Sequence, residues 1–399
     1  MSGMSIYERL NAIWKPKKQD RAPLQTGLWE ELGFAFSNNR AGTFLVREVP
    51  ALGIRIEDGA TAYIWGVIGK NHAPREPELG KMCFIDLETT GLNLGAGAFA
   101  FTIGIGYLDS GKAKVRQYFL RDHRDEPAAL HDLREFMEQF EGIVSYNGKC
   151  FDWPLLSDRF LFHRMSVPEL EGLHLDLLHA ARRVWKGVLN SFSLREVERC
   201  ILGLERIDDL PGYLVPAAYA NFLRTGSTRE IPPILEHNYR DIASLIELLQ
   251  RLGRVFLGAD QCCYRQEVVN AARIWADKGD YVRATDYLEN YLAQGGDLTA
   301  SELCFLARLH KRQGDYERAV ELWEKTAATA GLNSEPWIEL AKYYEHRRRD
   351  YPSARQCALR AMEIERQLAR LTGRDTEHSD LAKRLARLET KLGKKGSEN

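Results

Sequence analysis

The amino-acid sequence predicts an α/β domain, a mixed sheet with flanking helices, followed by an all-α solenoid. Short apolar runs, separated by turns and by amphipathic segments, fill residues 81–255, which indicates strands and helices that share a core. Residues 264–365 are helical in pattern and repeat with a period of 35 residues. The length of 399 residues fits two or three domains, and 44% apolar with 28% charged residues is typical of a globular protein.

Residues 1–80 hold no chemical motif, and the sequence predicts no role for them. Proline-bearing stretches at residues 14–23 and 73–77 surround two runs typical of short strands, AGTFLVREVPALGIRI and TAYIWGVIG. No apolar run reaches the ~18 residues of a membrane span, and the N-terminus does not resemble a signal peptide. Because no membrane span is predicted, we expect no membrane partner. Seven scattered cysteines without a CxxC pair favour a reducing, cytoplasmic location.

Residues 81–255 alternate between strand and helix patterns. MCFIDLE is an apolar run that ends in carboxylates, and AFTIGIGYLD and KVRQYFLRD predict two more strands joined by a DSGK hairpin turn. EPAALHDLREFMEQF is an amphipathic helix, and GIVSYNG is a fourth strand. Further helices are predicted at residues 152–164, 175–185, 193–202, 216–225 and 234–252. Strands and helices in this order make a layered α/β fold.

Residues 264–365 show internal similarity. The triplet GDY occurs at residues 279–281 and 314–316, and Asp350 and Tyr351 hold the same place in a third copy. A small residue, which lets two helices pack closely, follows each tyrosine by three positions. These residues are Ala284, Ala319 and Ala354. The period and the pattern resemble the tetratricopeptide repeat, which implies a solenoid that recruits an unidentified protein partner. A plain helical bundle is the alternative.

Residues 366–399 form a polar, basic segment that we expect to be helical and to cap the repeats. Leu381, Leu385 and Leu388 give it one apolar stripe. The net charge of −1 is unevenly placed, because residues 341–399 carry 15 Lys and Arg against 9 Asp and Glu. A basic end of this kind can meet nucleic acid, and a solvated helix face is the alternative interpretation.

Asp86 and Glu88 end the MCFIDLE run. Because residues two apart in a strand point to the same face, we expect both carboxylates to lie close together. Two buried carboxylates repel each other, and a divalent cation such as Mg²⁺ or Mn²⁺, which prefers oxygen ligands, removes that repulsion. Alone, such a pair is only a weak sign of a metal site.

Two later segments add candidates. Asp152 opens a predicted helix just after the GIVSYNG strand, where it is either a metal ligand or a helix cap. His237 and Asp241 are four residues apart beside the apolar stripe of the last helix of this region, so they share one face. This arrangement suits a metal ligand next to a general base, and a surface pair is the alternative.

In chain order, the stretches DLETTG, NGKCFD and HNYRD resemble the three exonuclease motifs of the DEDD superfamily, which has a ribonuclease-H-like fold. Within it the chain resembles the bacterial YprB-type ribonuclease-H-like proteins. The resemblance covers roughly residues 81–252 and implies that Asp86, Glu88, Asp152 and Asp241 hold two divalent ions, Mg²⁺ or Mn²⁺. One ion would lower the pKa of an attacking water and the other would stabilise the leaving 3′ oxygen.

The general base of this superfamily is a tyrosine or a histidine, and the spacing here departs from both common patterns. His237 stands four positions before Asp241, which is the tyrosine spacing. Tyr239 is two positions from Asp241, about 200° round a helix, and should face elsewhere. We expect His237 to be the base, because imidazole titrates near neutrality.

Three residues near the motifs are expected to contact substrate. They are Thr89, Asn147 and Lys149. Asn147 is alternatively a turn residue, since Asn-Gly is a common turn pair. We interpret Asp176 as structural, because the two-metal scheme does not need it. Phe151 and Trp153 flank the second motif, and core packing is the simpler interpretation of both, with base stacking as the alternative.

The sequence therefore predicts a metal-dependent 3′-to-5′ exonuclease that acts on single-stranded DNA or RNA. It does not distinguish the two nucleic acids. A non-catalytic nucleic-acid-binding or scaffold protein, acting through its repeats, is the first alternative. An endonuclease or structure-specific ribonuclease on the same fold is the second, because fold does not settle function.

Overall fold

The computed structural model describes residues 26–54, 64, 78–91, 98–170, 173–258, 264–329, 331–373 and 379–396. The chain divides into two compact units. The first comprises residues 1–180 and 191–254, and the second comprises residues 181–190 and 255–399. The two proline-bearing N-terminal stretches and, apart from Ile64, the TAYIWGVIG run lie outside the described residues.

The first unit is built on a seven-stranded mixed sheet in the order β1-β2-β5-β4-β3-β6-β7. The strands are β1 (Ala35–Asn39), β2 (Gly42–Pro50), β3 (Met82–Thr89), β4 (Ala100–Asp109), β5 (Lys112–Phe119), β6 (Gly142–Ser145) and β7 (His174–Asp176). β3, β4 and β5 pair antiparallel, and β6 and β7 continue the sheet in parallel. The predicted mixed sheet, including the DSGK hairpin, is confirmed.

Two features of the sheet differ from the sequence predictions. The stretch GTFLVREVP forms a strand, β2, as predicted, but β1 and β2 also extend the sheet of the following region, because β2 pairs with β5. Residues 175 and 176, predicted as the start of a helix, belong instead to β7, and the helix begins at Leu177. A three-residue strand has no measurable periodicity, and its pairing with β6 is a long-range contact.

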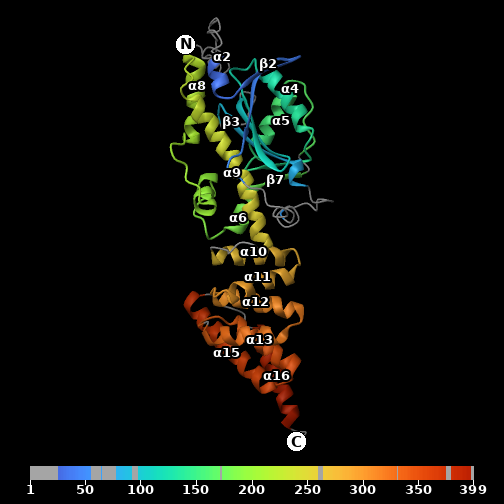
Figure 1. Ribbon diagram of the computed structural model, residues 1–399. Helices are drawn as coiled ribbons and strands as arrows, with labels where there is room; N and C mark the ends of the chain where they lie inside the picture. Colours follow the sequence, from blue (N-terminus) through green and yellow to red (C-terminus); the bar gives the residue numbers. More distant parts are fainter. Residues whose placement is uncertain are drawn as a thin grey trace, which may run out of the picture. The chain divides into compact units, whose positions relative to one another are not determined.

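Helices cover both faces of this sheet. In Figure 1, α4 and α5 lie on one face, and α8 and α9 lie on the other. The helices of the unit include α2 (Thr26–Glu31), α4 (Glu126–Met137), α5 (Asp152–Phe162), α6 (Leu177–Val184), α7 (Leu194–Val197), α8 (Val215–Thr225) and α9 (Ile231–Leu257), with short 3-10 and π turns at Leu79–Lys81, Glu198–Leu202 and Gly212–Leu214. The predicted helices from α4 onward are confirmed, with α9 longer at both ends.

Two glycines of β4 let α9 approach the sheet. A Cβ at Gly104 would lie 2.4 Å from Oδ1 of Asn238, and one at Gly106 would lie 2.5 Å from Ile242. The face of α9 that carries Asn238 and Ile242 therefore rests directly on the strand backbone. Because β4 pairs with β3, this close approach also brings α9 to the carboxylates of β3.

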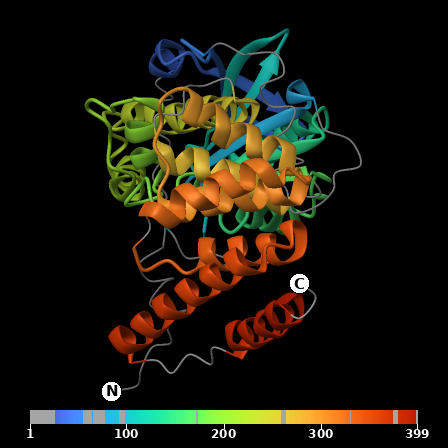
Figure 2. The same ribbon diagram turned by 90° about the horizontal axis from the view of Figure 1, so that it is seen from below.

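The second unit consists of successive antiparallel helix pairs. They are α10 (Arg265–Asp277) with α11 (Tyr281–Ala293), α12 (Ala300–Gln313) with α13 (Tyr316–Thr329), and α14 (Glu335–Tyr343) with α15 (Tyr351–Thr372), a π turn at Tyr344–Arg348 ending α14. Figure 2 shows the last helix, α16 (Ser379–Gly396), beside α15. The predicted all-α region is confirmed, and its identity as tetratricopeptide repeats stays a prediction.

The repeated GDY triplet has a local structural cause. Asp280, Asp315 and Asp350 each accept a hydrogen bond from a backbone amide three residues later, which caps the second helix of each pair. Gly279 and Gly314, with φ of 84° and 87°, make the left-handed turn before the cap. The three alanines of the motif are fully buried between the paired helices.

The C-terminal helix α16 packs as the sequence predicts. Leu381, Leu385 and Leu388 are buried against the preceding helices. In the described part of the chain, no helix is both long enough and apolar enough to span a membrane.

Candidate active site

The carboxylates of β3 face the helix α9. Asn238 of α9 donates hydrogen bonds to the carbonyl oxygen of Asp86 (3.1 Å) and to its Oδ2 (2.8 Å), and Gln117 in turn donates to Asn238 (2.7 Å). Glu88 lies 3.9 Å from Nε2 of His237, also on α9. Asp86 and Glu88 therefore share one face of β3, as strand alternation predicts.

Asp152 is the first residue of α5 and is held near the same carboxylates. The helix cap is Phe151, whose side chain makes no capping hydrogen bond, so Asp152 does not act as a helix cap. A Cβ at Gly148 would lie only 3.0 Å from Oδ2 of Asp152. Glycine therefore fits best in the loop beside this carboxylate. The alternative interpretation of Asp152 as a cap is thus not supported.

His237 and Asp241 point into the same region from α9. Nε2 of His237 lies 3.9 Å from Oδ2 of Asp241, the same distance as from Glu88. Nδ1 of His237 lies 3.0 Å and 3.1 Å from the two oxygens of Asp209, so this nitrogen donates to a carboxylate. Tyr239 faces elsewhere, as predicted, and its hydroxyl bonds the backbone of Pro50 and Leu52.

The electrostatics of these carboxylates indicate an excess of negative charge. Burial, then repulsion from neighbouring carboxylates with Asp241 the strongest, raises the pKa of Asp86 and of Glu88 well above their ordinary values. Burial raises the pKa of Asp152 to about 7, with Asp176 and Asp241 adding to the rise. Burial also raises the pKa of Asp241, although Arg206 and His237 oppose it. A bound cation would relieve this repulsion.

The region also contains a cation, Arg206, that the sequence motifs do not predict. Arg206, in the loop before α8, pairs with Glu198 (Nε to Oε2 2.6 Å), with Asp209 (3.1 Å) and with Asp241. Ion pairs raise its pKa even though burial lowers it. Its loop has no periodicity, and Asp241 is 35 residues away, so the only sequence signal was a charged cluster, ERIDD, between apolar residues.

The three predicted substrate residues border the carboxylates. Thr89 follows Glu88 at the end of β3, after a β-bulge, and donates to the carbonyl of Gly91. Asp176 accepts hydrogen bonds from the backbone amides of Asn147 (2.8 Å) and Lys149 (3.3 Å), which supports its structural interpretation. Asn147 has φ of 63°, so it serves as a turn residue. Contact of these residues with substrate stays a prediction.

A metal site is not preassembled in the described residues. No three His, Cys, Asp or Glu side chains among them are arranged to hold a metal ion. One oxygen of Asp241 accepts a hydrogen bond from Arg206, and one oxygen of Asp86 accepts a hydrogen bond from Asn238. The donor set of carboxylate oxygens nevertheless suits a hard divalent ion, and each of these two side chains has a second oxygen.

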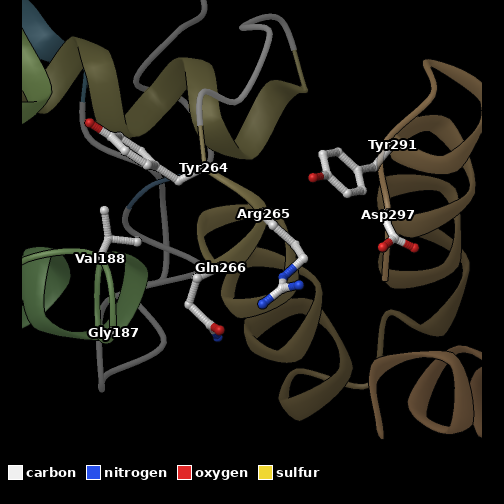
Figure 3. A pocket seen from close by; sticks show the side chains of 7 residues that line it. All are labelled: Gly187, Val188, Tyr264, Arg265, Gln266, Tyr291 and Asp297. Atoms are coloured by element: carbon white, nitrogen blue, oxygen red, sulfur yellow. The ribbon is translucent and has the colours of Figure 1, made fainter. Parts of the chain in front are cut away.

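A separate pocket of about 450 Å³ lies within the second unit. Figure 3 shows Arg265 between Tyr264 and Tyr291, beside Asp297. Gly187, Val188 and Gln266 complete its lining. The guanidinium of Arg265 is 3.5 Å from Glu302, and none of the predicted site residues lines this pocket. It therefore adds nothing to the carboxylate site.

Comparisons with known proteins identify the family of this chain. A family model described as RNase_H superfamily matches residues 83–253, a range that contains Asp86, Glu88, Asp152 and Asp241. The chain is also 33% identical over 335 residues to the uncharacterized protein YprB of Bacillus subtilis (strain 168), which covers 82% of this chain and 79% of the relative. The similarity thus extends over both units rather than the sheet domain alone.

Proposed function

This chain belongs to the family of Bacillus subtilis YprB and carries an RNase H superfamily domain, and on that premise we propose that it is a metal-dependent 3′-to-5′ exonuclease acting on single-stranded nucleic acid. The observation that carries the proposal is the convergence of Asp86, Glu88, Asp152 and Asp241 from three elements, with raised pKa values. Buried carboxylates that repel one another are arranged for binding cations.

The balance of charge supports a need for divalent ions. Glu198 and Asp209 add two carboxylates to the four, and Arg206 pairs with both of these as well as with Asp241. The guanidinium is therefore shared among three carboxylates. Although its charge also acts on Glu88, its ion pairs in the described part of the chain do not include Asp86, Glu88 or Asp152. These three and the second oxygen of Asp241 would hold Mg²⁺ or Mn²⁺. The ions would supply an activated water and neutralise charge on the reacting phosphate.

His237 is the residue we assign as general base. Asp209 accepts the Nδ1 proton, so the tautomer that fits this contact leaves Nε2 free to accept a proton from water. Nε2 also faces the carboxylates of Glu88 and Asp241. A water held between these groups would lose its proton to Nε2 as its oxygen attacks phosphorus.

The direct test is hydrolysis of 5′-labelled single-stranded DNA and RNA with Mn²⁺ or Mg²⁺. The wild type should give a ladder of products shortened from the 3′ end, and comparing the DNA and RNA substrates shows which nucleic acid is hydrolysed. The Asp86→Ala, Asp241→Ala double variant should give no ladder. A circular substrate should stay intact, because an exonuclease needs an end. Full activity in the double variant would contradict the proposed site, and cleavage of the circle would indicate an endonuclease.

A non-catalytic scaffold is the second candidate, and the pairing of Arg206 with Asp241 favours it, because that contact competes with a metal ion. In this case the second unit would be the functional part, recruiting a protein partner. Calorimetric titration with Mn²⁺ separates the two functions. Heat of binding that disappears in the Asp86→Ala, Asp241→Ala variant supports the nuclease, and no binding to the wild type supports the scaffold.

A further inference from the structure

The loop of residues 203–214, beside the carboxylate site, combines two buried charged side chains with several exposed apolar ones. Arg206 and Asp209 have side chains only 6% and 3% exposed, whereas the other two charged residues of the loop, Glu205 and Asp208, are exposed. Tyr213 is 82% and Ile207 73% exposed, and Leu204 and Leu214 are also exposed, while Leu210 is partly buried against the core. Exposed large apolar side chains gathered beside a candidate active site are typical of a binding surface.

The buried charges fix this loop against the site. Arg206 pairs with Asp241, and Asp209 accepts from His237, so both ends of the charged cluster are tied to α9. A Cβ at Gly212 would lie 3.5 Å from Nε2 of His237, so the loop backbone passes directly beside the nitrogen that we assign as base. Tyr213 is the next residue, with its α-carbon about 3.8 Å further along.

The exposed aromatic of the loop has no internal partner. No hydrogen bond, ring contact or ion pair within the described residues involves Tyr213, and its ring is more exposed than any other large apolar side chain they contain. A second aromatic lies next to the site on the α5 side, where Phe151 is 44% exposed and directly precedes Asp152. Trp153 is buried, so the stacking interpretation is open for Phe151 alone of that pair.

We infer that Tyr213, supported by Ile207 and with Phe151 on the α5 side, forms a nucleobase-binding surface for an unpaired strand whose scissile phosphate lies at the carboxylates. The inference rests on the proposed function. An aromatic face stacks on any base, so this surface is tolerant of sequence. Bases inside a duplex are already stacked on their neighbours, so the surface selects single-stranded ends.

Nucleobases fit this surface better than a protein partner does. The patch is continuous with the group that would deprotonate the attacking water, through Gly212 and Tyr213. A protein bound there would cover the site, whereas the nucleoside attached to a phosphate at the site must lie within a few ångströms of it. Arg206 and Asp209 hold the loop in place without a substrate, so the aromatic surface is already formed.

The test measures binding of a 5′-fluorescein-labelled single-stranded oligonucleotide by fluorescence anisotropy in Ca²⁺, with gels to verify that it stays intact. A second oligonucleotide is identical except that its last two 3′ nucleotides are abasic. Tyr213→Ala should weaken binding of the normal strand about 5- to 150-fold, the range for loss of one stacked base. It should change binding of the abasic strand less than about twofold, because the base is already missing. Tyr213→Phe should restore normal binding.

Phe162→Ala is the matched control. Phe162 is an exposed aromatic (65%, against 82% for Tyr213) at the far end of α5, ten residues and about 15 Å from Asp152, and its removal should leave both affinities unchanged. The inference is wrong if Tyr213→Ala lowers the affinity for both oligonucleotides equally, or for neither. It is also wrong if the wild type shows no measurable binding. Unchanged binding would leave the surface for a protein partner.

Hydrolysis of bis(p-nitrophenyl) phosphate by the wild type with Mn²⁺ distinguishes this inference from the proposed function. If the wild type hydrolyses that ester but binds both oligonucleotides equally well, the nucleobase surface is refuted and the proposed nuclease function is retained. If the ester is not hydrolysed but oligonucleotide binding depends on Tyr213 and on the bases, the proposed nuclease function is refuted and the nucleobase surface is retained.

Discussion

Each of the two units contains buried carboxylates within a cluster of ionic side chains, and the two clusters have opposite electrostatics. In the second unit, the carboxylate of Glu345 contacts Arg384 and Arg387 (2.7 Å) and Lys391 (2.9 Å) of α16. Burial alone would raise its pKa, but these cations lower it to about 2. In the first unit, burial raises the pKa of Asp86 well above its ordinary value, and the neighbouring carboxylates raise it further.

The difference teaches how to separate a structural ion cluster from a functional one. Around Glu345 the cations outnumber the carboxylates, and the three ion pairs to Arg384, Arg387 and Lys391 form a clamp that ties α16 to this glutamate. Around Asp86 the carboxylates outnumber the cations, so the folded protein carries a repulsion that a ligand can remove. Burial is common to both clusters, and only the balance of charge distinguishes them.

The largest effect on activity is expected from a substitution in the carboxylate cluster around Asp86. Asp86→Asn removes one negative charge and an oxygen that we propose as a metal ligand, so the proposed hydrolysis should fall about 10³-fold or more. In chelator, the same variant should unfold at a higher temperature than the wild type, because it removes repulsion between buried carboxylates. Asp158→Asn, an exposed carboxylate of α5, is the control and should change neither property. A lower melting temperature for Asp86→Asn in chelator would contradict the charge argument.

Removing the guanidinium of Arg206 from that cluster should cause a large loss of stability. Arg206→Met leaves the fully buried Glu198 without its partner, and breaking a buried pair in this way destabilises a protein by about 3–5 kcal/mol. Arg199→Met removes an exposed arginine that pairs with Glu196 on the surface, and should cost at most about 1 kcal/mol. Urea unfolding of both variants measures the difference, and equal losses would show that burial does not decide the effect.

Such contrasts mark the limit of sequence reasoning. Strand alternation and helix spacing place Asp86, Glu88 and the pair His237 and Asp241 correctly, because these signals are local. Arg206 lies in an aperiodic loop, and its partner Asp241 is brought to it by tertiary contacts. The pairing of β2 with β5 across about 70 residues is equally invisible to a periodicity argument.

A smaller effect is expected at the positioning residue of the base. Although burial raises its pKa, hydrogen bonds from His237 and Arg206 hold the pKa of Asp209 below its ordinary value, so it is a charged acceptor for Nδ1. An asparagine can donate as well as accept, so Asp209→Asn no longer holds the tautomer with Nε2 free. We expect kcat to fall about 10- to 100-fold, part of what a general base supplies, with little change in KM.

The neighbouring Asp208 provides the control for this variant. It is exposed, and its positive φ of 55° tolerates asparagine, so Asp208→Asn should keep wild-type kinetics. An equal fall in both variants, or a change confined to KM for Asp209→Asn, would argue that the loop acts through its structure alone.

The clamp in the second unit should respond to pH in the opposite sense to the carboxylate site. Because the folded pKa of Glu345 is about 2 and its ordinary value is 4.5, its stabilisation is present above pH 4.5 and is lost as the pH falls toward 2. For Asp152, whose pKa rises from 3.8 to about 7, the metal-free first unit loses stability as the pH rises through that interval. Hydrogen exchange of peptides from each unit should show these opposite trends.

Glu345→Gln tests the clamp directly. We expect a loss of about 2–3 kcal/mol and faster proteolysis within α16, since three cations lose their buried partner. Glu363→Gln, in a surface pair with Arg360, should be close to neutral. Unchanged proteolysis of α16 in Glu345→Gln would show that the leucine stripe alone fastens this helix.

The smallest expected effect concerns the turn that follows this clamp. The first two repeats use Gly279 and Gly314 for the left-handed residue, whereas the third uses Arg349, with φ of 54°. A side chain in this conformation costs about 1 kcal/mol relative to glycine. Arg349→Gly should therefore stabilise the protein by about 1 kcal/mol, and Arg349→Ala, which keeps a Cβ, should not. If the clamp at Glu345 holds this strained turn, the gain in unfolding free energy from Arg349→Gly should be larger in the Glu345→Gln background. A double-mutant cycle measures this difference.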